Sequence, residues 1–219
     1  METNIVKIKD YRNTSYKNDD FTLGNKKLVF MKKFKTDHPK VRNIYNTLKN
    51  RTNKYNSEFR RIYYNKCAYC GISTQVIDSS RFEVDHVIPL STLKINLDYS
   101  RDKINGIENL VNSCQMCNRG KRDFYCDEEN LKILHPDYNC LPQIFYRKKD
   151  YSIDINEDYG KNSVIIEFYR KLKFDNQLRR LDYLLMEMKD FCDIHEGEAI
   201  INDIQKLIFK IESKRRANY

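Results

Sequence analysis

Four cysteines in two closely spaced pairs are the residues of this sequence with the most evident chemistry. Cys67 and Cys70 form one C-x2-C pair, Cys114 and Cys117 form the second, and 43 residues separate the pairs. Each pair places two thiolates on one tight turn, and two such turns supply the tetrahedral sulfur ligands of a structural Zn2+ ion. One pair alone is compatible with a redox motif, but two pairs favour zinc. The other cysteines fall outside this spacing and are interpreted as packing or surface residues: Cys126, Cys140 and Cys192.

Polar side chains of a second kind lie beside the cysteine pairs. Asp85 and His86 belong to a strand-like run, and Asn118 directly follows the last cysteine. If zinc joins the two pairs, the Asp85–His86 strand comes close to a helix that begins near Asn118. Carboxylate and carboxamide oxygens suit a hard divalent cation, and a neighbouring imidazole that titrates near neutral pH is free to accept a proton. The sequence thus predicts a second metal site next to a general base.

Taken in order, these motifs resemble the cysteine-bearing branch of the HNH endonucleases. The resemblance covers about residues 62–124 and rests on Cys67-x2-Cys70, Glu83-Val84-Asp85-His86-Val87-Ile88-Pro89, Glu108-Asn109-Leu110-Val111 and Ser113-Cys114-x2-Cys117-Asn118-Arg119-x-Lys121. Asn118 stands where other members carry a histidine, and the family commonly uses this variant. The resemblance implies a ββα-metal core and a metal-dependent nuclease that leaves a 5′-phosphate and a 3′-hydroxyl.

The resemblance also implies a role for each motif residue. His86 is expected to be the general base, and Asp85 and Asn118 the ligands of a catalytic Mg2+ or other divalent ion. Asn109 is expected to orient the loop and the His86 ring. DNA phosphate contacts are expected from Arg119, Lys121 and Arg122. The alternatives are structural: a buried or zinc-binding histidine at 86, a strand-end cap at 85, a helix N-cap at 118, a turn-forming Asn109 and a solvated basic helix face.

Regular elements are predicted around these motifs. Apolar steps of three and four residues predict a helix over residues 40–64, and residues 81–89 read as a strand stopped by Pro89. Residues 91–106 are polar and aperiodic, which predicts a loop, and residues 117–124 read as the start of a helix.

The two ends of the chain are predicted to differ from each other. Residues 1–24 are polar with little periodicity, which predicts a loosely held arm. Residues 127–160 are expected to be largely loop. Three apolar stripes, near residues 164–172, 178–191 and 200–211, predict a helical bundle that acts as a scaffold or a dimer interface, with Asp175 as an N-cap between the first two.

The predicted fold class is therefore α+β. A small ββα-metal nuclease core with a four-cysteine zinc site is flanked by a basic N-terminal helical segment and a C-terminal helical bundle. The predicted divisions are residues 1–66, a basic arm and helix; residues 67–126, the nuclease core; and residues 127–219, a mainly helical region for partner or dimer contacts.

Charge along the chain supports a polyanionic partner. The 219 residues carry a net charge of +9, with 40 Lys and Arg against 31 Asp and Glu. Residues 1–66 hold 17 basic and 6 acidic side chains, residues 67–126 hold 7 of each, and residues 127–219 hold 16 and 18. Because the excess lies in the first third, we expect that third to face the phosphates of double-stranded DNA.

Composition excludes several other classes of protein. No run approaches the length of apolar residues that spans a membrane, and the N-terminus lacks the apolar core of a signal peptide. We therefore expect a cytoplasmic protein that does not contact membranes.

Three functions are compatible with these features. The first is a metal-dependent DNA endonuclease in prokaryotic restriction or anti-phage defence, acting alone, as a homodimer or with a larger defence partner docked on the C-terminal helices. The second is a homing or mobile-element endonuclease, followed by an RNA-cleaving toxin. The third is a non-catalytic zinc module that binds nucleic acid, which requires neither the Asp85–His86 pair nor Asn118.

Overall fold

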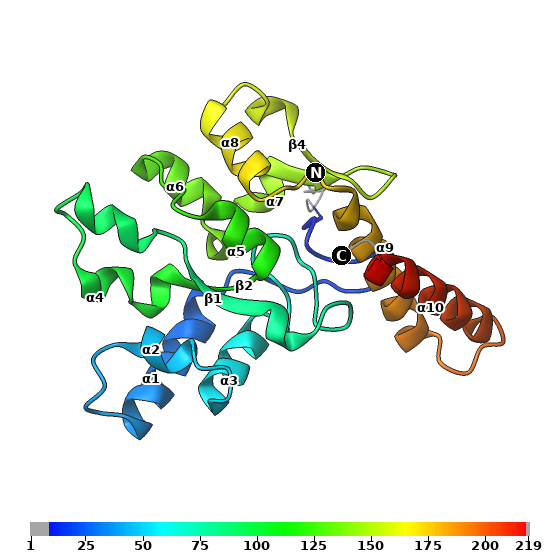
Figure 1. Ribbon diagram of the computed structural model, residues 1–219, viewed down its shortest axis with the longest axis horizontal. Helices are drawn as coiled ribbons and strands as arrows, with labels where there is room; N and C mark the ends of the chain where they lie inside the picture. The colour runs from blue at the N-terminus through cyan, green and yellow to red at the C-terminus, as the bar shows by residue number, and fades with distance from the viewer. Residues whose placement is uncertain (1–8, 218–219) are drawn as a thin grey trace, which may run out of the picture.

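The computed structural model describes residues 9–217, and it is an α+β structure of helices with two small sheets (Figure 1). The strands are β1 (Phe82–His86), β2 (Leu110–Cys114), β3 (Phe145–Arg147) and β4 (Ile153–Ile155). The α-helices are α1 (Gly24–Asp37), α2 (Ile44–Leu48), α3 (Lys54–Ile62), α4 (Arg101–Ile104), α5 (Gln115–Lys121), α6 (Glu128–Leu134), α7 (Leu141–Ile144), α8 (Ser163–Lys171), α9 (Gln177–Ile194) and α10 (Ile201–Ala217).

The centre of the molecule is a ββα unit made of β1, β2 and α5. β1 and β2 pair in antiparallel register, with Asp85 opposite Val111 and His86 opposite Leu110. The strand is shorter than the predicted 81–89, and Pro89 lies beyond its end. Because α5 begins directly after β2, at Gln115, the second cysteine pair lies at the junction of strand and helix. This junction places Cys114 and Asn118 within one turn of each other.

The single helix predicted over residues 40–64 is wrong, because the structure contains α2 and α3 with a turn between them. The side chain of Asn50 accepts hydrogen bonds from Thr52, and Asn53 caps α3 by accepting from the Tyr55 amide. Short polar side chains compete with the helical hydrogen bonds in this way. The apolar periodicity survives the break because both short helices bury their apolar faces in one core.

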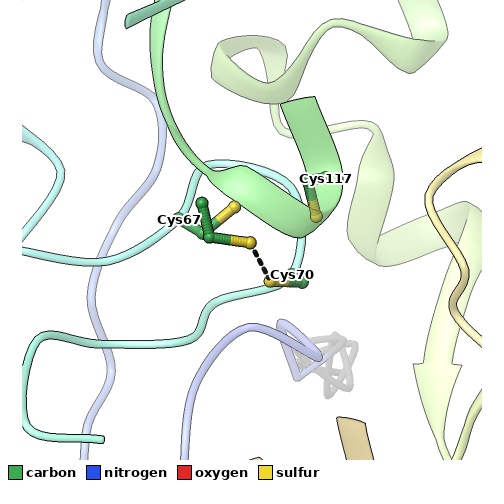
Figure 2. A group of neighbouring side chains, drawn as sticks. Cys67, Cys70 and Cys117 are labelled. Atoms are coloured by element: carbon green, nitrogen blue, oxygen red, sulfur yellow. Dashed lines mark hydrogen bonds between the residues drawn. The ribbon is translucent and has the colours of Figure 1, made fainter. Parts of the chain in front are cut away.

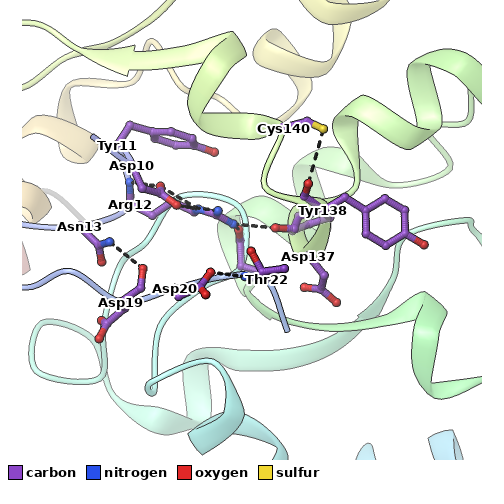
Figure 3. A network of polar contacts seen from close by, with 12 residues as sticks. Asp10, Tyr11, Arg12, Asn13, Asp19, Asp20, Thr22, Asp137, Tyr138 and Cys140 are labelled. Atoms are coloured by element: carbon purple, nitrogen blue, oxygen red, sulfur yellow. Dashed lines mark hydrogen bonds and ion pairs between the residues drawn. The ribbon is translucent and has the colours of Figure 1, made fainter. Parts of the chain in front are cut away.

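The predicted loosely held arm is also wrong for residues 9–23; residues 1–8 lie outside the described part of the chain. Arg12 is fully buried and donates to the carbonyl oxygens of Ala68 and Pro136, both at 2.9 Å, while Asp10 accepts from its guanidinium (Figure 3). A Cβ on Gly71 would lie 2.3 Å from the Arg12 carbonyl oxygen, and Gly71 has a φ of +76°. Only glycine allows the arm to lie so close to the first cysteine turn.

Three cations of the N-terminal third are used inside the protein. Arg12, Lys27 and Lys66 are buried, and each pairs with a carboxylate. Lys27 lies 2.6 Å from Asp137, far away in the sequence. Part of the +11 of residues 1–66 therefore stabilises the fold and is not presented to a partner.

The C-terminal helices divide between two places. α8 packs against α5 and α6, whereas α9 packs mainly against α10, and these two helices extend together away from the ββα unit (Figure 1). Gly120 of α5 makes the first contact possible, since a Cβ there would lie 2.1 Å from the Lys171 carbonyl oxygen. The N-cap of α9 is Asn176, one residue after the predicted Asp175.

Residues 127–160 contain more structure than the predicted loop, namely α6, α7 and the β3–β4 pair. Between residues 9 and 217, the chain forms no helix with the length and hydropathy to cross a membrane. The domain divisions near residues 66 and 126 stay predictions.

Candidate metal centre and active site

The two cysteine pairs meet in a buried cluster. The four Sγ atoms of Cys67, Cys70, Cys114 and Cys117 lie within 4.8 Å of one another, and those of Cys70 and Cys114 are 3.7 Å apart. Tetrahedral Zn2+ with Zn–S bonds of about 2.3 Å requires sulfur atoms about 3.8 Å apart. Figure 2 shows the sulfur atoms of the labelled cysteines converging from the first turn and from α5. The cluster therefore fits a four-coordinate zinc ion, as predicted.

A cation from α9 lies against this cluster. Arg179 is only 3% exposed and donates to the Cys117 Sγ at 3.1 Å, to the Cys114 Sγ at 3.8 Å and to the Leu172 carbonyl oxygen at 2.7 Å. Four thiolates around Zn2+ leave two negative charges, so a buried guanidinium compensates charge that burial disfavours. The sequence prediction missed Arg179, because it lies outside the motif and only the fold brings α9 there.

Asp85, on β1, is enclosed between the first cysteine turn and α5. Its carboxylate accepts a hydrogen bond from the Tyr69 hydroxyl at 2.8 Å, and the Lys121 ammonium lies at 3.4 Å. Burial raises the pKa of Asp85, and Lys121 and the Tyr69 hydroxyl oppose this rise. The resulting group is a buried carboxylate that is held by one cation and one hydroxyl.

Asn118 lies against Glu83, not against Asp85 as predicted. Its Nδ2 donates to the Glu83 carboxylate at 2.7 Å, and Gln115 and Arg51 also donate to Glu83. Glu83 and Asp85 are two residues apart on β1, so both project toward α5. The sequence prediction missed Glu83 as a site residue, although this alternation was the signal that could have found it.

His86 is held by contacts that the motif did not reveal. Its Nε2 lies 2.9 Å from the Asn105 Oδ1, and the Tyr45 ring packs on it with 4.3 Å between ring centroids. His86 is 7% exposed. Burial lowers its pKa, while Asn105 and Asp85 act in the opposite direction. The imidazole is therefore neutral at pH 7.

Asn109 holds the loop after β1. Its Oδ1 accepts from the Ile88 amide at 2.8 Å, and its Nδ2 donates to the carbonyl oxygens of Ile88 and Ile104. Asn109 was also expected to orient the His86 ring. Within residues 9–217, however, the side chain that contacts the His86 Nε2 is Asn105 and not Asn109.

The three cations predicted to contact phosphates have different environments. Arg119 and Arg122 are exposed, and Arg119 lies 3.8 Å from Glu83. Lys121 is 1% exposed and donates to the His86 carbonyl oxygen at 2.8 Å. As a correction, Lys121 does not present its ammonium to a ligand phosphate, because that group is enclosed between the end of β1 and Asp85.

A recess of about 180 Å3 opens beside these residues. Glu83, Asn118 and Tyr45 line it, together with the cations Lys49 and Arg51 from the chain after α2. β1 thus carries two carboxylates on the face toward α5, where Asn118 contacts Glu83, and His86 follows Asp85 on the strand and contacts Asn105 and Tyr45. Tyr45, Glu83 and Asn118 line the small basic recess.

Comparison with known proteins agrees with this geometry. Residues 67–124 match the family model described as HNH endonuclease. These residues form an HNH nuclease domain. No curated protein and no solved structure matches the chain. The matched HNH segment includes the four cysteines, β1, β2 and α5, so the predicted resemblance to this family is confirmed.

Proposed function

We propose that this protein is a metal-dependent endonuclease that hydrolyses phosphodiester bonds of double-stranded DNA. The observation that carries the proposal is the local arrangement of β1 and α5: Asn118 contacts Glu83, Asp85 lies two residues further along β1, and His86, whose pKa is lowered, follows it directly. This combination of metal ligands and a base exceeds what a zinc module that only binds nucleic acid requires.

Glu83, Asp85 and Asn118 would hold the catalytic cation. Their carboxylate and carboxamide oxygens are the donors that Mg2+ prefers, and rotation of the Asn118 carboxamide would turn its Oδ1 toward Glu83. When bound, such an ion supplies positive charge to a phosphate oxygen and to the leaving 3′ oxygen. Arg51 and Arg119 form ion pairs with Glu83 in the structure. The Glu83 carboxylate therefore already interacts with positive charge, which supports its role as a ligand of a cation.

His86 would take the proton from the attacking water. Because the Asn105 Oδ1 is an acceptor, the His86 Nε2 carries its proton and donates it to that oxygen. The Nδ1 lone pair is then the basic atom. Asn105 fixes the ring orientation, and the lowered pKa keeps the imidazole in its basic form at pH 7.

The experiment compares His86→Ala with His195→Ala in cleavage of supercoiled plasmid DNA with Mg2+. His195 is the matched control, because it caps α9 away from the hairpin. We expect His86→Ala to lower the rate by about 10²- to 10⁴-fold and to keep its zinc, while His195→Ala retains the parental rate. A His86→Ala protein that cuts at the parental rate would show that His86 is not the general base. Failure of the parent with Mg2+, Mn2+ and Ni2+ would favour the zinc binding module.

As the biological setting, we propose prokaryotic restriction or anti-phage defence. A compact HNH unit next to cationic surfaces supports action on foreign DNA. The test is the plating efficiency of phage on cells that express the parent or His86→Ala. Protection that requires His86 supports defence, and equal plating on both strains contradicts it.

A further inference from the structure

A second and larger opening lies on the side of α5 away from the candidate active site. We call it the α5–α8 cleft: about 930 Å3 in volume, it lies between α5, the end of α8, the start of α9 and the chain around residues 72–81. Eight of its 17 lining residues are Lys or Arg, and two are Asp. This excess of positive charge is concentrated in one concave surface, which favours an anionic ligand.

The cations at the bottom of the cleft already have partners. Arg179 donates to the Cys117 Sγ and the Leu172 carbonyl oxygen, and Arg215 pairs with Asp182. These two groups stabilise the zinc cluster and the α9–α10 pair. They are therefore part of the cleft floor and are not available to a ligand.

The cations at the rim are different. Between residues 9 and 217, no carboxylate lies within ion-pair distance of Arg122, Arg170 or Lys173, and all three are exposed. Arg119 and Lys171 have one long ion pair each, of 3.8 Å to Glu83 and 3.6 Å to Glu167. Exposed pairs of this kind contribute little, so these cations can exchange a carboxylate for a phosphate.

Arg119 connects the candidate active site to the cleft across α5. Arg119 follows Asn118 directly, pairs with Glu83 beside the recess and also lines the cleft. Because Gly120 has no Cβ, the cationic end of α8 can approach this helix closely. A nucleic-acid backbone that leaves the recess across α5 therefore meets Arg119 and Arg122 first, and then residues 170–173.

We propose that the α5–α8 cleft binds the sugar-phosphate backbone of the DNA next to the cleaved phosphodiester. Arg122, Arg170 and Lys173 are the phosphate ligands, and two of these come from the C-terminal region. That region has a charge of −2 by sequence and was expected to act only as a scaffold or interface. The inference rests on the proposed function only in taking DNA as the substrate.

The experiment measures DNA binding without cleavage. In a His86→Ala background, Arg170→Gln/Lys173→Gln is compared with Lys149→Gln/Lys210→Gln, which removes the same charge from exposed positions outside both openings. Fluorescence anisotropy of a labelled duplex from about 50 to about 200 mM salt gives the dissociation constant and its salt dependence. Zinc content and circular dichroism verify that both variants are folded.

We expect the cleft variant to bind DNA about tenfold or more weakly, and the slope of log affinity against log salt to fall by about one to two in magnitude. The control should keep the slope of the parent. A cleft variant with the dissociation constant and slope of the control would overturn the proposal. So would inorganic phosphate binding that depends on Arg170 and Lys173 while DNA binding does not.

The cleft and the proposed nuclease activity can fail separately. If the cleft variant loses DNA binding but the parental protein never cuts DNA, the cleft proposal stands and the nuclease proposal fails. If the parental protein cuts DNA and the cleft variant binds DNA like its control, the nuclease proposal stands and the cleft proposal fails.

Discussion

The two sides of the ββα unit use the same short helix for opposite purposes. On one side, α5 contributes Cys117 to a sulfur cluster that is closed, buried and covered by Arg179. On the other, Asn118 points to Glu83 beside an open recess. One side has four cysteines that fit a structural ion, while the other has the carboxylates and carboxamide proposed to hold a catalytic cation, beside an open recess.

This difference separates stability from activity along one turn of α5. A closed four-cysteine site leaves no position for a ligand, so its metal contributes to folding. On the carboxylate side, protein cations neutralise Glu83 and Asp85, so folding there does not require a metal ion. Substitutions on the sulfur side should therefore act mainly on the fold, and those on the carboxylate side on the rate of cleavage.

Loss of the zinc site should have the largest effect. Cys70→Ser, or treatment with a strong chelator, should unfold the ββα unit, because structural zinc contributes on the order of 10 kcal/mol to folding. Cys192→Ser is the matched control, since Cys192 lies on α9 outside the cluster. Circular dichroism and zinc content provide the measurement. A zinc-free Cys70→Ser protein with the parental melting transition would show that the cluster is not what holds this fold.

Arg179 tests whether the sulfur side needs a compensating charge. Arg179→Met should weaken zinc binding by about 10- to 100-fold, because a hydrogen-bond donor to two thiolates is lost. Arg180→Met is the control, since the neighbouring Arg180 contacts the Asp150 carbonyl oxygen and not the cluster. The measurement is zinc transfer to a chromogenic chelator. Equal rates of zinc transfer in the two variants would show that Arg179 does not stabilise zinc binding.

The local parts of this arrangement could be predicted from the sequence. Two C-x2-C pairs, the alternating strand before Pro89 and the order of the motif lie within residues 67–124, where spacing determines what can meet. The zinc cluster and the HNH identity follow from them. The match over residues 67–124 confirms the resemblance to the HNH family, and the clustered sulfur atoms confirm that the four cysteines meet.

The parts that could not be predicted depend on contacts between distant segments. Arg179 reaches the cluster from 62 residues away, and Arg12 reaches Ala68 and Pro136 from the arm. Charge counted along the chain is incomplete for the same reason. It placed all the positive charge in the N-terminal third, whereas folding buries Lys27 and brings Arg170 and Lys173 beside α5.

Asn105 tests the carboxylate side through the orientation of His86. Asn105→Ala should slow cleavage by about tenfold with zinc content unchanged, because the ring loses the acceptor for its Nε2 proton. Asn105→Asp keeps an acceptor, and its negative charge should shift the acid limb of the pH–rate profile to higher pH. A purely structural Asn105 would change stability and leave that limb in place.

The smallest expected effect is the change in the cleavage rate of the parental protein with pH. It tests the general base on the carboxylate side without altering either side. Burial lowers the pKa of His86 below its ordinary value of 6.5, and only the neutral imidazole can accept a proton. At pH 6.5, less than half of the base is protonated, so the single-turnover rate should fall by less than about twofold from pH 8 to pH 6.5. The rate should decline more steeply only below that pH. A decline that begins above pH 7 would mean that the pKa of the base is raised, and that the general base is not the buried His86 next to Tyr45.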